Sequence, residues 1–167
     1  MKNSLLSLLV LTSASLLSGC GEREAADDII NPPRSEEAAR VLSGEEAIAG
    51  ADIPTLDPAT MVDAEIAKVL GSPAQCTFRY TSAGKPILAL KGTPGGTATT
   101  AVLKVNAHLV ELQPAGGDGN LVLTSGPISV TLSADDVQAE EKVEADMVFA
   151  IGESLRVGYS GYYQCGG

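Results

Sequence analysis

The chain has no tryptophan, only four tyrosines and two phenylalanines, and a single histidine, His108. A folded core must therefore consist mainly of Val, Leu, Ile and Ala side chains. One histidine cannot build a histidine-based metal site, and we interpret His108 as a polar surface residue beside a turn. The sequence also lacks the GxSxG, HExxH and GxxxxGK[ST] patterns of hydrolases, metalloproteases and nucleotide-binding proteins. We therefore expect no metal, no dissociable cofactor and no enzymatic activity.

Basic residues are scarce as well, because 11 Lys and Arg stand against 21 Asp and Glu, for a net charge of −10. Binding to nucleic acid requires clustered Lys and Arg, so we exclude nucleic acid as a partner. The acids concentrate in residues 20–70, with 12 acids and 4 bases, whereas residues 71–167 have 9 acids and 6 bases. We interpret the acidic pairs Asp135-Asp136 and Glu140-Glu141 as a solvated loop rather than as catalytic carboxylates.

An apolar run from Leu5 to Leu17 follows Lys2 and precedes a charged stretch. This layout is typical of a secretory signal, and the run is too short for a membrane-spanning helix, which needs about 20 apolar residues. The run ends in Leu-Ser-Gly-Cys, residues 17–20, which resembles the lipobox of bacterial lipoproteins.

The lipobox resemblance implies how the chain is processed and where it is held. Residues 1–19 would be removed as a signal peptide, and Cys20 would become the N-terminus and carry a thioether-linked diacylglycerol, usually with an N-acyl chain. The membrane would then be a partner through this covalent lipid. Because Gly21 rather than Asp follows Cys20, the resemblance also implies the outer membrane, facing the periplasm.

The remaining cysteines form a pair, since lipid on Cys20 leaves Cys76 and Cys165. An exported compartment permits disulfides, and a Cys76–Cys165 disulfide would staple the two ends of the folded domain. A redox-active pair would call for CxxC spacing or a low-pKa setting, neither of which is visible, so we favour a structural disulfide. By parity the bridge would also bring together an aromatic cluster: Phe78, Tyr80, Tyr159 and Tyr163.

Residues 20–58 contain many acids, several Pro and Gly residues and no aromatic residue. Such a composition buries too little apolar surface to offset the entropy of ordering. We therefore predict a lipidated N-terminus followed by a disordered acidic tether. Residues 35–42 could form a short helix, but that helix would be marginal on its own.

Residues 59–70 are predicted to form a helix. Asp57 suits the N-cap, Pro58 suits the first helical position, and Gly71 suits the C-terminal end. An apolar stripe recurs at helical spacing, at Val62, Ile66, Val69 and Leu70. We favour packing of this stripe on the rest of the domain over binding to a partner protein.

From Gln75 onward the apolar pattern changes to the period of two that is typical of strands. About eight short segments show it, separated by turns rich in Gly, Pro and Asn: residues 76–81, 86–91, 100–105, 108–112, 121–124, 128–132, 143–149 and 155–165. The pattern predicts a mainly β domain, a small antiparallel β-sandwich or barrel. Together with the short N-terminal helix, it would occupy residues 59–167.

Tyr162 differs from the other aromatic residues, because parity along the last strand turns it away from the cluster. Exposed aromatic residues are common anchors of binding surfaces, so Tyr162 is a candidate binding residue. Packing of Tyr162 beneath the helix at residues 59–70 is an equally good interpretation.

Three segments of the domain resemble small envelope lipoproteins of alphaproteobacterial type: Cys-Thr-Phe-Arg-Tyr at 76–80, Gly-Lys-Pro-Ile-Leu-Ala at 84–89, and Arg-Val-Gly-Tyr-Ser-Gly-Tyr-Tyr-Gln-Cys at 156–165. This resemblance carries no activity with it. We therefore expect a lipid-anchored cell-envelope protein that acts as a non-enzymatic binding or structural module, with an envelope protein as a candidate partner.

The architecture is also similar to that of the periplasmic lysozyme-inhibitor lipoproteins, which combine a lipobox with a small disulfide-closed β-barrel. The alternative function is accordingly a periplasmic inhibitor of a basic enzyme such as lysozyme, for which an acidic domain is suited. The Ser-Gly motif of those inhibitors is not reproduced, because Ser125-Gly126 precedes Pro127-Ile128. Inhibitory residues are therefore not carried over.

Overall fold

The computed structural model describes residues 38–92, 98–116, 120–135 and 141–166. The described residues belong to one compact unit, which begins at Ala38. The predicted signal peptide, Cys20 and the first part of the predicted tether lie outside the described residues. Among the helices that are described, none has the length and apolar character to cross a membrane.

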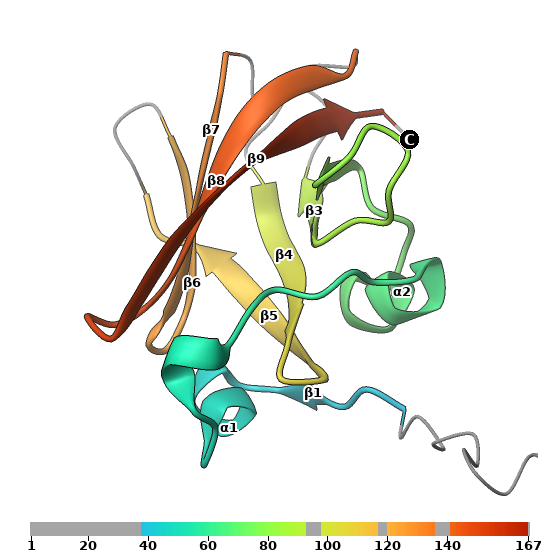
Figure 1. The fold of residues 1–167 in the computed structure, drawn as a ribbon. Coiled ribbons are helices and arrows are strands. Elements are labelled where there is room, and N and C mark those ends of the chain that lie inside the picture. The colour runs from blue at the N-terminus through green and yellow to red at the C-terminus, as the bar shows by residue number, and fades with distance from the viewer. Residues whose placement is uncertain (1–37, 93–97, 117–119, 136–140, 167) are drawn as a thin grey trace, which may run out of the picture. The chain divides into compact units, whose positions relative to one another are not determined.

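Within the described residues, the fold is a closed antiparallel β-barrel with one added strand (Figure 1). The strands run in the order β1-β5-β4-β3-β2-β9-β8-β7-β6, and a further pairing of β5 with β6 closes the barrel. Their bounds are β1 Val41–Leu42, β2 Cys76–Arg79, β3 Leu88–Gly92, β4 Ala98–Val105, β5 His108–Pro114, β6 Leu121–Ser125, β7 Ile128–Ala134, β8 Val143–Ile151 and β9 Leu155–Cys165. β2 to β9 form the antiparallel barrel, and β1 pairs in parallel with β5. The predicted mainly β fold is confirmed, and of the two predicted architectures the structure is the barrel.

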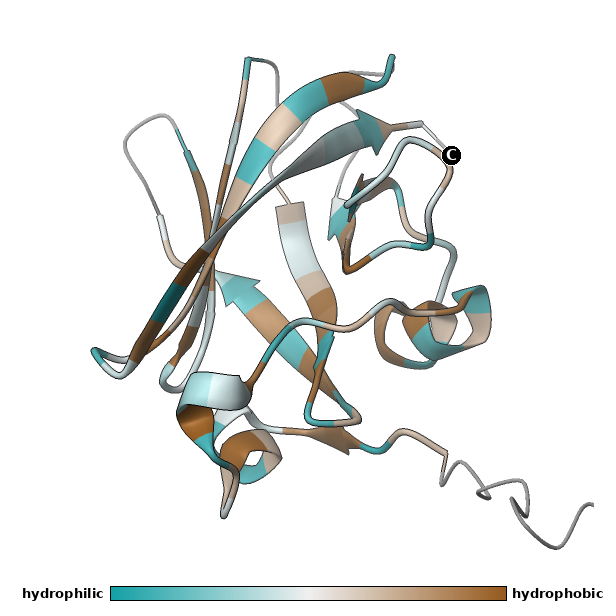
Figure 2. Cartoon of the chain, in the orientation of Figure 1, coloured by the Kyte–Doolittle hydropathy of each residue, from teal (hydrophilic) through white to brown (hydrophobic). Residues whose placement is uncertain are grey.

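Apolar and polar residues alternate along the strands, so that apolar side chains point into the barrel. Figure 2 shows this alternation as bands of differing hydropathy along β8. The largest of them are Phe78, Phe149 and Tyr163, each at most 1% exposed. Among the residues that the structure describes, no buried side chain is polar or charged. The interior of the barrel is therefore a packed apolar core.

Asn106 and Ala107 form the tight turn between β4 and β5. Both residues are left-handed, with φ of 50° and 62°. Two successive residues with positive φ are typical of the type I′ hairpin turn, whose twist matches that of the flanking strands.

Helix α2 spans Asp63–Leu70, which is shorter than predicted. The N–H of Ala59 donates to the carbonyl of Lys104 on β4, and that of Met61 donates to the carbonyl of Pro86 just before β3, so residues 59–61 do not form a helical turn. Asp57 and Pro58 are therefore not the N-cap and first position, and the Glu65 carboxylate accepts the Val62 N–H. Gly71 ends the helix in a left-handed conformation, as predicted.

The apolar side of α2 packs on the outward face of β3, β4 and β5, where it forms a second core. Ile66 and Leu70 are buried there with Met61, Ala89, Val102 and Leu109. Lys104 of β4 pairs with Glu65 at 2.6 Å and ties the helix to the barrel. The predicted packing role is confirmed, although Val62 lies 43% exposed at the helix start.

The segment 38–61, which we call the strap, corrects the predicted tether, because residues 38–58 belong to the folded domain. The strap contains β1, helix α1 (Gly44–Ile48) and the short 3-10 helix η2 (Ile53–Thr55), and it then crosses the barrel in front of β4 (Figure 1). Ala47 is fully buried in the main core. The prediction failed because it weighed acids, Pro and Gly, whereas a few apolar residues dock on the barrel: Leu42, Ile48, Ile53 and Leu56.

Local capping also shapes the strap. Ser43 caps α1 by accepting the Glu46 N–H, while the Glu46 carboxylate accepts the Ser43 N–H. These bonds from Ser43 lower the pKa of Glu46. The short helix predicted over residues 35–42 is wrong at its C-terminal end, since Val41 and Leu42 form β1.

Candidate functional site

The disulfide between Cys76 and Cys165 is present, as predicted. The two cysteines stand directly opposite each other on β2 and β9, and the next facing pair inside the barrel is Phe78 and Tyr163. The bridge therefore joins the first and last strands of the barrel. The lipid on Cys20 stays a prediction, because Cys20 lies outside the described residues.

The predicted aromatic cluster is confirmed beside the disulfide. The rings of Tyr80 and Tyr159 lie 5.4 Å apart between centroids. Gly161 leaves room for the cluster, because a Cβ there would lie 2.8 Å from the Phe78 ring and would overlap the backbone of β2. Only glycine fits at this point without displacing a neighbour.

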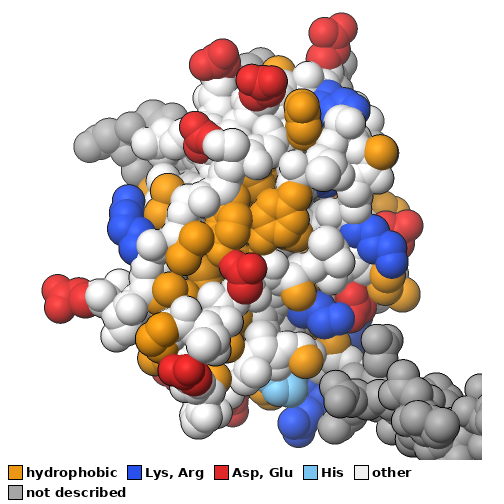
Figure 3. Space-filling view, viewed as in Figure 1, with side chains coloured by type: hydrophobic (Ala, Val, Ile, Leu, Met, Phe, Trp, Pro, Cys, Tyr) orange, Lys and Arg blue, Asp and Glu red, His pale blue; other side chains and the backbone are white. Residues whose placement is uncertain are grey.

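Two tyrosine hydroxyls of the barrel form hydrogen bonds with the strap. Tyr159 donates to the carboxylate of Asp57, and Tyr80 donates to the Pro58 carbonyl at 3.1 Å. Burial and then the Asp57 charge raise the pKa of Tyr80 to about 12. Burial, followed by the hydrogen bond to Asp57, also raises the pKa of Tyr159 well above its usual value. Figure 3 shows the side of the molecule that the strap crosses, where apolar side chains gather in the centre with charged groups around them.

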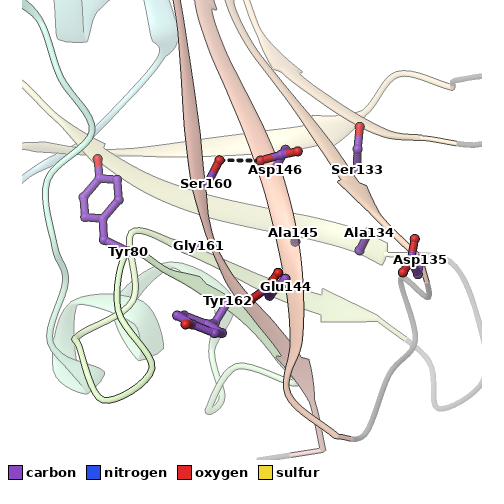
Figure 4. Close-up of a pocket in the computed structure, with 10 residues that line it drawn as sticks. All are labelled: Tyr80, Ser133, Ala134, Asp135, Glu144, Ala145, Asp146, Ser160, Gly161 and Tyr162. Carbon is purple, nitrogen blue, oxygen red and sulfur yellow. Dashed lines mark hydrogen bonds between the residues drawn. The ribbon is translucent and has the colours of Figure 1, made fainter.

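On the outside of β7, β8 and β9 lies a shallow depression of about 680 Å³, which we call the acidic depression (Figure 4). Three small residues in register across the strands are among its lining: Ala134, Ala145 and Gly161. The remaining lining consists of three carboxylates, two serines and two tyrosines: Asp135, Glu144, Asp146, Ser133, Ser160, Tyr80 and Tyr162. The Ser160 hydroxyl donates to Asp146 at 2.6 Å.

Tyr162 is half-buried at the edge of the acidic depression. It is not beneath α2, which packs on β3, β4 and β5, so the packing interpretation of Tyr162 is wrong. Lys142 lies with its Nζ 5.9 Å from the centre of the Tyr162 ring and donates to the Ser82 carbonyl at 3.0 Å. The role of Tyr162 in binding stays a prediction.

A second hollow of about 500 Å³, the α2 groove, lies between α2 and the outward face of β2. Its apolar lining includes Ile66 and Ala67 of the helix, and two of its lining residues are cations, Arg79 and Lys85. Arg79 stands directly opposite Tyr162 in the pairing of β2 with β9. The α2 groove and the acidic depression are therefore neighbours, with Tyr162 between them.

Nothing in the described part of the chain gathers three or more His, Cys, Asp or Glu side chains that could hold a metal ion. His108 begins β5, where its Nδ1 is buried without a hydrogen-bond partner among the described residues. It lines neither hollow. Carboxylates lie on one side of Tyr162 and two cations on the other.

The acidic depression was not predicted from the sequence. The signal that would have found it is the alternation along residues 143–149, where Glu144 and Asp146 occupy the outward positions between apolar neighbours. Ser160 and Tyr162 occupy the outward positions of the last strand in the same way. The alternation did not show that these two strands pair with each other, which is what brings the four residues together.

Comparison with curated proteins found no match, and comparison with solved structures found none either. A family match covers residues 16–167, which includes the whole described domain and the Leu17–Cys20 stretch. On this match the chain belongs to the family described as Domain of unknown function (DUF6692).

Proposed function

We propose that the protein is a lipid-anchored cell-envelope protein whose barrel acts as a non-enzymatic binding or structural module. The observation that carries the proposal is the use of the three cysteines. The disulfide takes Cys76 and Cys165 and leaves Cys20, at the end of the apolar run, as the cysteine open to lipid attachment. A disulfide and a lipidated cysteine both call for export.

The proposed location is the outer membrane, with the domain in the periplasm, because Gly21 follows Cys20. The described domain begins at Ala38, so residues 21–37 separate it from the anchor. Seventeen residues reach at most about 60 Å when fully extended. The start of the domain at Ala38 would therefore stay within that distance of the membrane.

A binding role is supported by where the polar groups lie. The barrel interior is filled, whereas the outward faces of β8, β9 and β2 hold two adjoining hollows with charged linings. A half-buried tyrosine lies between them, and tyrosines in such positions are enriched among the residues that dominate binding energy.

The test is the intact mass of the native protein with and without reductant. The expected N-terminus is a lipidated Cys20, and reduction should add two hydrogen atoms for the Cys76–Cys165 bridge. A Cys20→Ser variant is the control and should lose lipid and membrane attachment while it keeps the bridge. Another N-terminus, or free thiols at Cys76 and Cys165, would contradict the proposal.

The acidic depression favours a second candidate function, inhibition of a basic enzyme such as lysozyme. Three carboxylates around a shallow hollow suit a cationic partner surface. The test is lysozyme activity in the presence of the lipid-free chain, residues 21–167. A stoichiometric complex that Asp146→Asn with Glu144→Gln weakens, and Glu111→Gln does not, would support inhibition. Unchanged lysozyme activity at saturating chain would exclude it.

A further inference from the structure

Charged groups of opposite sign flank Tyr162 on the outside of the barrel. Glu144 of β8 stands opposite Tyr162 on one side, and Arg79 of β2 stands opposite it on the other. Neighbouring strands lie about 4.8 Å apart, so the Cα atoms of Glu144 and Arg79 lie roughly 10 Å apart across the sheet. The line from Glu144 to Arg79 runs perpendicular to the strands.

Each sign extends beyond that line. Asp146 and Asp135 add negative charge on the side of β8 and β7. Lys85 adds positive charge in the α2 groove, which Asp63 also lines. Lys142 adds a positive charge beside Tyr162 itself, since its Nζ lies 5.9 Å from the centre of that ring and donates to the Ser82 carbonyl. The surface is therefore acidic on one side of β9 and mainly basic on the other.

We propose that this surface binds a second copy of the same chain about a two-fold axis parallel to β9 over Tyr162. Rotation about such an axis leaves each residue of the second copy at the same height along β9 but moves it to the opposite side of Tyr162 across the strands. It places the carboxylates of Glu144 and Asp146 of each copy opposite Arg79 and Lys85 of the other. Both charge contacts form at once, as an isologous two-fold interface requires. The two Tyr162 rings lie near the axis, each with the Lys142 ammonium of its own copy beside it.

Charge complementarity selects a second copy over other occupants. A uniformly basic partner would meet Arg79 and Lys85 with like charge, and a uniformly acidic one would meet Glu144 and Asp146. The whole chain carries a net charge of −10, which opposes association at long range. At physiological ionic strength the screening length is about 8 Å, so groups in contact decide the outcome.

The experiment is sedimentation velocity of the lipid-free chain, residues 21–167, over a range of concentrations. The natural chain should show a concentration-dependent dimer. An acid-reversed variant, Glu144→Lys with Asp146→Lys, and a base-reversed variant, Arg79→Glu with Lys85→Glu, should each dissociate at least roughly tenfold more readily. An equimolar mixture of the two variants should restore the dimer, because the mainly basic surface of one variant then faces the mainly acidic surface of the other.

The matched control is Glu111→Lys with Glu153→Lys, which changes net charge as much as the acid reversal does. Both glutamates are exposed and line neither hollow, so this variant should dimerise like the natural chain. A natural chain that stays monomeric at every concentration would overturn the proposal. So would a mixture of reversed variants that stays monomeric while each variant retains the circular dichroism spectrum of the fold. A complex with lysozyme but no dimer would assign the surface to the inhibitor function instead.

Discussion

Removal of the disulfide should destabilise the barrel without unfolding it. Cys76 and Cys165 are 89 residues apart in sequence, and the bridge closes nearly the whole domain. In the chain-entropy model, closing a loop of this length raises the free energy of the unfolded chain by about 4 to 5 kcal/mol. The stability measured to be lost on removing such a bridge is often smaller. We therefore expect Cys76→Ala with Cys165→Ala to lose about 2 to 5 kcal/mol. Small domains have about 5 to 15 kcal/mol in total, so the variant should still fold.

The assay is equilibrium unfolding in urea of residues 21–167, followed by far-ultraviolet circular dichroism. With an m-value of about 1.5 kcal/mol/M, a loss of about 3 kcal/mol lowers the midpoint by about 2 M. The m-value should also rise, because an unfolded chain without the bridge exposes more surface. The natural chain unfolded in reductant is the control and should match the variant. A variant whose midpoint and m-value equal those of the oxidised natural chain would refute the reasoning.

Three further predictions concern the contacts of the barrel. Gly161→Ala should cost about 1 to 3 kcal/mol in urea unfolding, because its Cβ overlaps the backbone of β2, whereas Gly158→Ala on the same strand meets nothing within 4 Å and should be neutral or slightly stabilising. Gly44→Ala should detach α1, since its Cβ would overlap the Ser125 carbonyl, and limited proteolysis should then cut the strap faster. Tyr159 has a raised pKa in the folded state. Its contribution to the free energy of unfolding is therefore complete below a pH of about 10 and is lost as the pH rises further. Tyr159→Phe should therefore show a smaller fall in urea midpoint above that pH; an equal fall would contradict the assignment.

Much of the barrel could be predicted from sequence because its signals are local. Alternation placed the strands, and Asn106-Ala107 and Gly71 sit where left-handed backbone is needed. The disulfide followed from counting cysteines in an exported chain. These features depend on neighbouring residues or on chemistry, and neither requires knowledge of which strands pair.

The strap could not be predicted, because its order comes from distant contacts. Ala47 and Leu42 have no local reason to be buried; the end of the barrel buries them. The start of α2 was predicted wrongly for the same reason, since the N–H groups of Ala59 and Met61 donate to Lys104 on β4 and to Pro86 just before β3, both distant in sequence. The acidic depression likewise depends on the registers of three strands, which alternation alone does not give.

The structure points to the β2–β9 pair as the best supported part of the barrel. The disulfide joins the two strands, Phe78 packs against Tyr163 inside, and the strap is hydrogen-bonded through Tyr80 and Tyr159. Outward residues on this pair, Tyr162 among them, are therefore held on a rigid backbone. Binding surfaces benefit from such rigidity, because little entropy is lost when a partner docks. The bridge that stabilises the fold should thus also strengthen binding, and reduction should weaken self-association even under conditions in which the barrel stays folded.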